Sequence, residues 1–189
     1  MSKQNEIYFS LDVETDGPCP GLHSMLSLGC VAFSETGEEL GDYYVNLTLL
    51  PEATPDPKTM QFWADHQKYY DATRTWCQTP EEAMPHFAEW VKGFGGSPVA
   101  VCMPSGFDFT WVYYYLHRFA GHSPFSFSVL DMKTMAMCML KRPYRQAVKK
   151  NWPREWFSKL PHTHHALEDA REQGHTFVRM LKCLREDLP

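Results

Sequence analysis

Apolar residues in the first quarter of the chain fall into three short runs that predict β-strands. The run at 6–14 is rich in strand-forming residues and ends in alternating apolar and polar positions. The run at 25–34 is almost wholly apolar, and a third occupies 39–48. Gly and Pro residues at 16–21 and Thr-Gly at 36–37 provide turns between them. Three consecutive strands with short connections predict an antiparallel meander.

Beyond this meander the apolar residues change to helical spacing. Helices are predicted at 57–66, 80–94, 107–120, 131–140 and 166–186, short strands at 98–103 and 126–130, and a helix or irregular basic stretch at 144–159. This order predicts an α/β fold with a mixed sheet, the antiparallel meander plus parallel strands, flanked by helices. No linker or repeat interrupts the pattern, so we expect one domain over residues 1–189.

Two carboxylates stand together at the end of the first predicted strand. Asp12 and Glu14 are two positions apart, and residues i and i+2 of a strand point to the same side. Such a pair repels itself unless a cation or a shared proton intervenes. Taken alone, such a pair is most often a solvated strand end.

Two further acids follow predicted strands. Asp108 comes after the strand at 98–103 and opens the helix at 107–120. A carboxylate there can cap the helix, but the carboxyl end of a strand is also where α/β sheets build their sites. Asp131, at the start of the helix at 131–140, is interpreted as an N-cap rather than as a ligand.

The last helix is preceded by a cluster of histidines. His162, His164 and His165 lie just before it, and Asp169 lies in its first turn or two. We expect His164 in the loop and Asp169 facing back toward that loop. The crowding leaves a zinc site open as an alternative, although no cysteine pair or His-Glu-x-x-His spacing completes a tetrahedral ligand set.

These motifs, taken in order, resemble those of a known enzyme family. Asp-x-Glu on the first strand, Phe-Asp opening a central helix and His-x4-Asp at the last helix are similar to the DEDDh (DnaQ-like) branch of the 3′–5′ exonucleases, which have a ribonuclease H-like fold. The residues that carry the likeness lie at 9–15, 107–108 and 164–170, with a further similar segment at 129–134. The resemblance spans about residues 6–185. Met103 and Pro104 depart from it, because family members commonly have His-Asn there.

The resemblance implies the chemistry of the site. Asp12, Glu14, Asp108 and Asp169 would bind two divalent cations, Mg²⁺ or Mn²⁺, which prefer oxygen ligands. His164 would be the general base that takes the proton of the attacking water. His165 is a rival by proximity, but only His164 has the family's spacing to Asp169.

Two substrate contacts are also expected from the likeness. The backbone N–H of Thr15 would bind the terminal 3′-hydroxyl group, and Leu11 or a nearby apolar side chain would pack against the terminal base.

The distribution of charge along the chain is more informative about nucleic-acid binding than the net charge. With 18 Lys and Arg against 23 Asp and Glu, the net charge of −5 argues against binding of nucleic acid by bulk positive charge. Residues 141–159, however, hold seven basic residues and one acid, and include Trp152 and Trp156. Basic residues interleaved with aromatics suit a single strand, whereas tryptophans that pack on the core are the alternative. The substrate-binding candidates in this stretch are Lys149, Lys150, Trp152 and Arg154.

Other features bound the cellular context. The six cysteines are scattered without a Cys-x-x-Cys pair, which favours a reduced, cytoplasmic protein. No targeting segment and no apolar stretch approaching the ~20 residues of a membrane span is visible. The abundant aromatic residues make a homo-oligomer, such as a dimer, a reasonable expectation.

The sequence therefore predicts a metal-dependent 3′–5′ exonuclease that acts on the 3′ ends of single-stranded RNA or DNA, with RNA slightly preferred, and releases nucleoside 5′-monophosphates. Two alternatives stay open. One is a catalytically silent nucleic-acid-binding or scaffold domain of the same fold, and the other is a zinc-binding protein that uses the histidines at 162–165.

Overall fold

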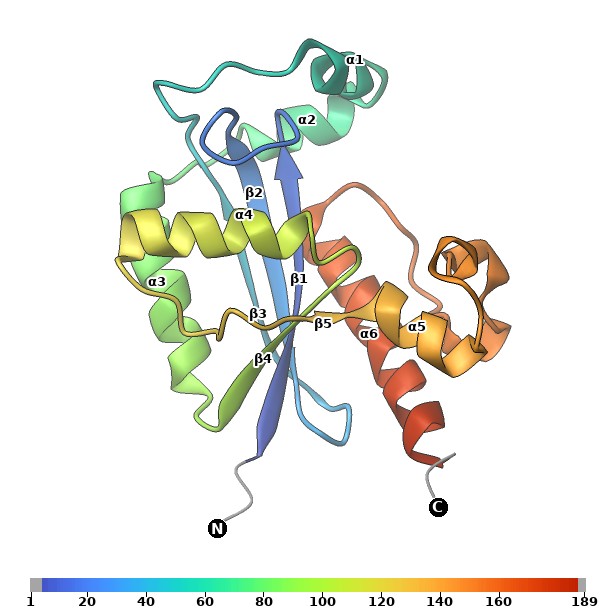
Figure 1. Ribbon diagram of the computed structural model, residues 1–189. Coiled ribbons are helices and arrows are strands. Elements are labelled where there is room, and N and C mark those ends of the chain that lie inside the picture. The colour runs from blue at the N-terminus through green and yellow to red at the C-terminus, as the bar shows by residue number, and fades with distance from the viewer. Residues whose placement is uncertain (1–4, 187–189) are drawn as a thin grey trace.

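The computed structural model describes residues 5–186, which form a five-stranded sheet with helices on both faces (Figure 1). The strands lie side by side in the order β3 (Glu39–Asn46), β2 (Met25–Phe33), β1 (Glu6–Thr15), β4 (Ser97–Cys102) and β5 (Leu130–Asp131). The pairs β1–β2 and β2–β3 are antiparallel, whereas β4 is parallel to β1 and β5 is parallel to β4. The predicted mixed sheet of the α/β class is thus confirmed.

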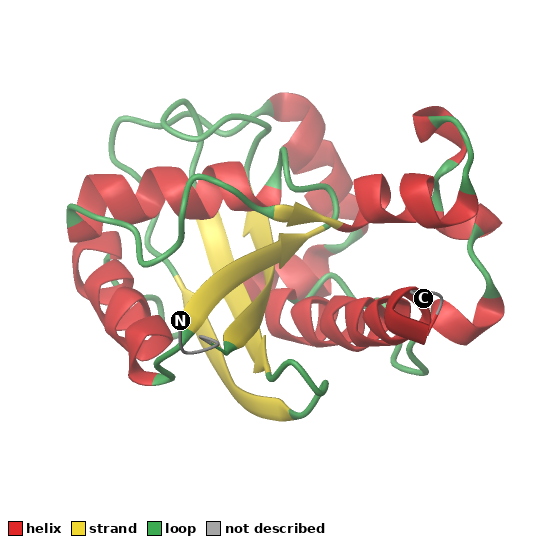
Figure 2. Ribbon diagram, turned by 60° about the horizontal axis from the view of Figure 1, so that its bottom comes forward, coloured by secondary structure: helices red, strands yellow, loops and turns green. Residues whose placement is uncertain are grey.

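The helices around the sheet are α1 (Pro57–Asp65), α2 (Gln67–Thr73), α3 (Pro80–Gly93), α4 (Asp108–Tyr115), α5 (Met132–Leu140) and α6 (Ala166–Glu186). The helices α3 and α4 lie on one face of the sheet and α5 and α6 on the other (Figure 2), whereas α1 and α2 lie beyond the end of β1 (Figure 1). Side chains of α3 and α4, such as Phe87 and Trp111, belong to one hydrophobic cluster, and side chains of α5 and α6, such as Ala136 and Phe177, belong to a second. Among residues 5–186, no helix combines the length and the apolar character needed to cross a membrane.

The central strand β1 separates the two clusters by its alternation. Phe9, Leu11 and Val13 point into the cluster under α3 and α4. The opposite row faces α6, where Gln173 donates hydrogen bonds to Ser10 Oγ and to the Leu11 carbonyl, both at 3.0 Å. Asp12 continues this second row, so its carboxylate is directed toward α6.

One predicted strand has different bounds in the structure, and one predicted helix has a different last turn. The strand predicted at 126–130 is reduced to Leu130–Asp131, because Phe125 packs into the core beside α4 while Phe127 is 84% exposed, away from the sheet. The helix predicted at 107–120 has the expected extent and ends at Gly121, which has a φ of 75°, but its last turn at Leu116–Ala120 is π-helical instead of α-helical.

Two further segments differ from expectation or resolve an open choice. A separate helix, α2, follows α1 directly and was not predicted. The stretch 144–159 is irregular, with three short 3-10 turns at Tyr144–Gln146, Lys149–Asn151 and Arg154–Trp156. Prolines interrupt a regular helix in this stretch, and the buried side chains of Trp152 and Trp156 anchor it to the core.

The start of α6 lies directly on β2 at Gly29. A Cβ atom at Gly29 would stand 2.2 Å from the Ala166 carbonyl carbon and 2.3 Å from its oxygen, so only glycine permits this approach. Gly29 is also the register partner of Asp12 on β1. The contact therefore sets how close the first turn of α6 comes to the acidic end of β1.

We expect Gly29→Ala to lower the free energy of unfolding by about 1–3 kcal/mol, because the new methyl group meets backbone atoms that cannot rotate away. Urea unfolding followed by circular dichroism measures the change. Gly93→Ala is the control: nothing lies within 4 Å of a Cβ there, and Gly93 ends helix α3. It should be neutral or stabilising by up to about 1 kcal/mol. Equal stabilities of the two variants would contradict the proposed tight contact.

Candidate active site

Carboxylates from three distant parts of the sequence meet at the carboxyl end of β1. One oxygen each of Asp12, Glu14 and Asp169 lies within 4.8 Å of the other two. Asp12 and Glu14 are neighbours on one face of β1, and Asp169 comes from the first turn of α6. The predicted proximity of the first and last motifs is therefore observed.

Asp108 joins this group from the start of α4. Its carboxylate is 4% exposed and accepts a hydrogen bond from the Val13 amide of β1 at 3.3 Å. The chain thus couples the first residue of α4 to the backbone between Asp12 and Glu14. The four carboxylates border a cleft of about 210 Å³, which is lined by Asp12, Val13, Glu14, Met103, Pro104, Phe107, Asp108, His162, His164 and Asp169.

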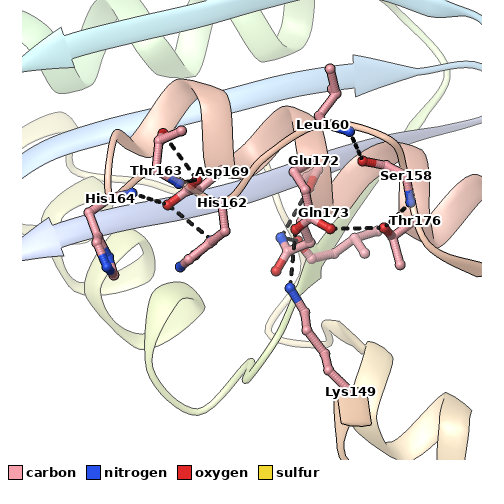
Figure 3. A network of polar contacts seen from close by, with 12 residues as sticks. Lys149, Ser158, Leu160, His162, Thr163, His164, Asp169, Glu172, Gln173 and Thr176 are labelled. Atoms are coloured by element: carbon pink, nitrogen blue, oxygen red, sulfur yellow. Dashed lines mark hydrogen bonds and ion pairs between the residues drawn. The ribbon is translucent and has the colours of Figure 1, made fainter. Parts of the chain in front are cut away.

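Asp169 also organises the loop that precedes α6 (Figure 3). Its Oδ1 accepts a hydrogen bond from the Thr163 amide at 2.7 Å, and its Oδ2 accepts one from the His164 amide at 2.8 Å. His162 Nδ1 lies 3.2 Å from the same Oδ2. His164 has a φ of 59°, an uncommon backbone conformation that these bonds support. Asp169 therefore faces the loop as predicted, and it fixes the position of His164.

The carboxylates strongly disfavour their own ionisation. Burial, followed by the charges of Asp108, Glu14 and Asp169, raises the pKa of Asp12 well above its usual range, and Lys149 opposes this only in part. Burial and the charges of Asp169 and Asp108 raise the pKa of Glu14 in the same direction. Burial raises the pKa of Asp108 to about 7, against the hydrogen bond from Val13. The cluster thus lacks compensating positive charge.

This donor set fits divalent cations. Oxygen-only carboxylate ligands suit Mg²⁺ or Mn²⁺, and bound cations would supply the positive charge that the cluster lacks. Asp12, Glu14, Asp108 and Asp169 are the residues placed to hold them.

Three aromatic side chains that the sequence analysis missed surround His164. The His164 ring lies edge-on to Phe62 at 5.3 Å, to His66 at 5.0 Å and to Tyr69 at 6.2 Å between ring centroids. Phe62 lies on α1, Tyr69 lies on α2 and His66 lies between the two helices. The predicted helix at 57–66 covers Phe62 and His66, whereas no sequence signal marked Tyr69. Partial burial lowers the pKa of His164, as do His162 and His66, while Asp169 opposes the shift. The imidazole is therefore held in the neutral form that can accept a proton.

His165 does not join the cleft. Its ring stacks on Tyr44 at a centroid distance of 4.5 Å, and its buried Nδ1 has no hydrogen-bond partner. Of the two neighbouring histidines, only His164 faces the carboxylates, in agreement with the spacing to Asp169.

Two of the predicted substrate contacts are contradicted by burial. Leu11 is fully buried under α4 and cannot pack against a base. Trp152 is 5% exposed and belongs to the cluster under α6, as does Trp156, whose ring lies 5.9 Å away. The tryptophans of the basic stretch therefore pack on the core, because their large apolar rings anchor a segment without regular structure.

Of the other predicted contacts, the three basic residues lie at or near the surface, whereas Thr15 is buried. Lys149 reaches the Glu172 carboxylate on α6 at 3.1 Å, near enough to Asp12 to affect its pKa. Lys150 and Arg154 are exposed. Thr15 is 6% exposed, and its hydroxyl donates to the Gly17 carbonyl at 2.8 Å.

Asp131 is an N-cap, as predicted. Its Oδ1 accepts hydrogen bonds from the amide and the hydroxyl of Thr134 at 2.7 and 2.8 Å, and its Oδ2 accepts one from the Ser105 amide at 2.9 Å. Burial opposes ionisation of Asp131, but these hydrogen bonds outweigh it and lower its pKa. This acid is satisfied by the protein itself, in contrast to Asp12.

The protein belongs to a class of nucleases that degrade chains from the 3′ end. Residues 8–181 match the family model described as the 3′–5′ exoribonuclease Rv2179c-like domain, and the chain belongs to this family. The 3′–5′ DNA exonuclease Cap18 of Escherichia coli is 30% identical over 190 residues, which cover 98% of this chain and 97% of that protein. Membership in this family makes the chain a 3′–5′ exonuclease and implies that it depends on divalent cations.

Solved structures agree in fold. The nuclease domain of 3′hExo, a DEDDh family member bound to rAMP, aligns with a TM-score of 0.68 and 14% identity over 96% of this chain and 94% of that one. Exonuclease I of E. coli in complex with a dT13 oligonucleotide aligns with a TM-score of 0.70 and 13% identity over 98% of this chain and 43% of that one. The expected ribonuclease H-like architecture of DEDDh exonucleases is thus confirmed.

We expect Asp12→Asn to raise the free energy of unfolding in EDTA by an amount on the order of 1 kcal/mol, because one of the repelling charges is removed. The matched variant Asp131→Asn should lower it by about 1 kcal/mol, since an amide nitrogen cannot accept the bonds that Asp131 accepts. Thermal denaturation with EDTA and with Mg²⁺ measures both. A melting temperature of Asp12→Asn below that of the wild type in EDTA would argue against electrostatic strain in the cluster.

Proposed function

We propose that the chain removes nucleotides one at a time from the 3′ ends of single-stranded nucleic acid and releases nucleoside 5′-monophosphates. One observation carries the proposal: Asp12, Glu14, Asp108 and Asp169 converge with His164 on a single open cleft. This combination offers ligands for cations and a neutral base beside them. A silent nucleic-acid-binding domain would have no need to maintain three buried acids, Asp12, Glu14 and Asp108, whose pKa values burial raises.

The reaction breaks the bond between phosphorus and the 3′-oxygen of the penultimate nucleotide. Divalent cations, when bound by the four carboxylates, neutralise charge that develops on the phosphate and favour ionisation of water. His164 accepts the proton of the attacking water, whose oxygen forms the new bond to phosphorus. The departing 3′-oxygen takes up a proton from solvent water and becomes the new chain end. Asp169, through its bonds to the loop, holds His164 on the cleft side.

The terminal base needs a contact surface other than Leu11 and Trp152, both of which are buried. Phe62 is 38% exposed, and its ring meets the edge of His164, so it stands at the rim of the cleft. We assign base stacking to Phe62. Lys150 and Arg154 are proposed to attract the phosphates of the strand, and Lys149 to add positive charge near Asp12. The 3′-hydroxyl contact through the backbone of Thr15 stays part of the proposal.

Both polymers are proposed as substrates, with RNA preferred. The description of the family names an exoribonuclease, whereas Cap18 is named as a DNA exonuclease. A cleft of about 210 Å³ suits a strand end rather than a duplex. The six cysteines, all free thiols, support our proposal of a reducing compartment such as the cytoplasm.

We expect Asp108→Asn and His164→Asn each to reduce the rate of nucleotide release by at least about 100-fold, since a cation ligand or the general base is lost. Asp65→Asn, an exposed acid on α1, is the control and should retain full activity. The measurement uses 5′-end-labelled RNA and DNA oligonucleotides with Mg²⁺, Mn²⁺ or EDTA. Wild-type shortening that persists in EDTA, or full activity of Asp108→Asn, would refute the proposal.

We expect Phe62→Ala to raise KM for an oligonucleotide by roughly fivefold to 100-fold, because base stacking on an aromatic ring contributes about 1–3 kcal/mol. Trp76→Ala is the control, since Trp76 is 96% exposed and does not line the cleft. Steady-state kinetics on a short single strand compare the two. An unchanged KM in Phe62→Ala would remove Phe62 from the binding site.

A further inference from the structure

Asp169 belongs to two different groups of potential metal ligands. The first is the carboxylate group with Asp12 and Glu14, and the second consists of His162, His164 and Asp169. In each group the ligand atoms lie within 4.8 Å of one another. The proposed hydrolysis uses His164 as a base and Asp169 as a cation ligand, but it does not require the three residues to bind one ion together.

The spacing of the second group suits a small tetrahedral cation. His162 Nδ1 and Asp169 Oδ2 are 3.2 Å apart. Two ligands of a tetrahedral Zn²⁺ ion, with bonds of about 2.0–2.1 Å, stand about 3.3 Å from each other. The centroids of the His162 and His164 rings are 5.0 Å apart, so modest ring rotations bring both to one ion.

The loop presents these donors in a prearranged form. The backbone amides of Thr163 and His164 donate hydrogen bonds to Asp169. These bonds hold the backbone that joins His162 to His164. Figure 3 shows the His162 and His164 side chains extending to the same side of the loop, beside Asp169. Because the loop is already ordered, the binding of an ion costs less conformational entropy.

The two groups differ in the ions they select. Imidazole nitrogen suits Zn²⁺ and related transition metals, whereas Mg²⁺ prefers the oxygen-only group. His162 is an exposed side chain, so an ion can reach the site from solvent. The His165 ring, which stacks on Tyr44, takes no part.

We propose that His162, His164 and Asp169 form an inhibitory site for Zn²⁺. A bound Zn²⁺ ion occupies the nitrogen lone pair with which His164 would accept a proton, and it engages the Asp169 carboxylate that the catalytic cations also require. Zn²⁺ binding follows from this geometry alone. Inhibition rests on the proposed function, and because Asp169 is shared, excess Mg²⁺ should weaken it.

The binding experiment needs no nuclease activity. The full chain, freed of metals with a chelator, is titrated with Zn²⁺ in a calorimeter, and the same is done for His162→Asn and His66→Asn. His66 is the matched control, because its ring also lies 5.0 Å from that of His164 but it is not in the ligand group. We expect one Zn²⁺ site, weakened at least tenfold in His162→Asn and unchanged in His66→Asn. Absence of binding, or equal weakening in both variants, would overturn the site.

The activity experiment tests the consequence. Nucleotide release by the wild type in Mg²⁺ should fall as Zn²⁺ is added, and the Zn²⁺ concentration for half inhibition should rise with the Mg²⁺ concentration. His162→Asn should lose at least tenfold of its sensitivity to Zn²⁺, with the rate at each Zn²⁺ concentration taken relative to the rate of the same variant in Mg²⁺ alone. Undiminished sensitivity in this variant would contradict inhibition through the histidine site. Failure of the wild type to cleave in Mg²⁺ would instead refute the proposed function, while the calorimetric result stands by itself.

Discussion

The close contact between the first turn of α6 and strand β2 is the constraint on which the cleft depends. Gly29 lets the Ala166 backbone approach to a distance that any side chain would block. Because Gly29 is paired with Asp12, this contact brings Asp169 next to the end of β1. The Asp108 carboxylate accepts a hydrogen bond from the Val13 amide, which places the fourth acid beside Asp12 and Glu14. A packing contact and a hydrogen bond thus assemble four acids from three elements.

Without bound cations, the four carboxylates repel one another. This repulsion favours the binding of cations, which relieve it. Burial and mutual repulsion raise the pKa values of Asp12 and Glu14 well above their ordinary range. Asp131 shows the contrast, because hydrogen bonds from Ser105 and Thr134 lower its pKa and leave it nothing to gain from a cation. Cation affinity in the cleft therefore comes from charge that the fold concentrates and does not neutralise. The net charge of −5 described the whole chain and could not reveal this local arrangement.

Asp169 connects catalysis to the proposed control by zinc. Its carboxylate accepts hydrogen bonds from two backbone amides, belongs to the acidic cluster and lies beside His162. A substitution of Asp169 would remove the hydrogen bonds that hold the loop as well as a proposed cation ligand. A loss of activity in such a variant would therefore not distinguish a structural effect from a loss of cation binding. Asp108 and His162 can be replaced with a narrower consequence. The loop is thus the place where the position of the base, the cation set and the accessibility of the histidines are decided together.

The sequence by itself determined the order of elements, the acidic pair on β1, the cap at Asp131 and the spacing of His164 to Asp169, because these follow from periods of two and 3.6 residues and from local hydrogen bonding. Tertiary structure alone decided which side chains reach the cleft. Leu11 and Trp152 are apolar enough either to stack on a base or to fill a core, and packing under α4 and α6 chose the core. Phe62 and His66 meet His164 only because α1 and α2 fold across the end of β1, a contact over about a hundred residues of sequence that no local pattern encodes.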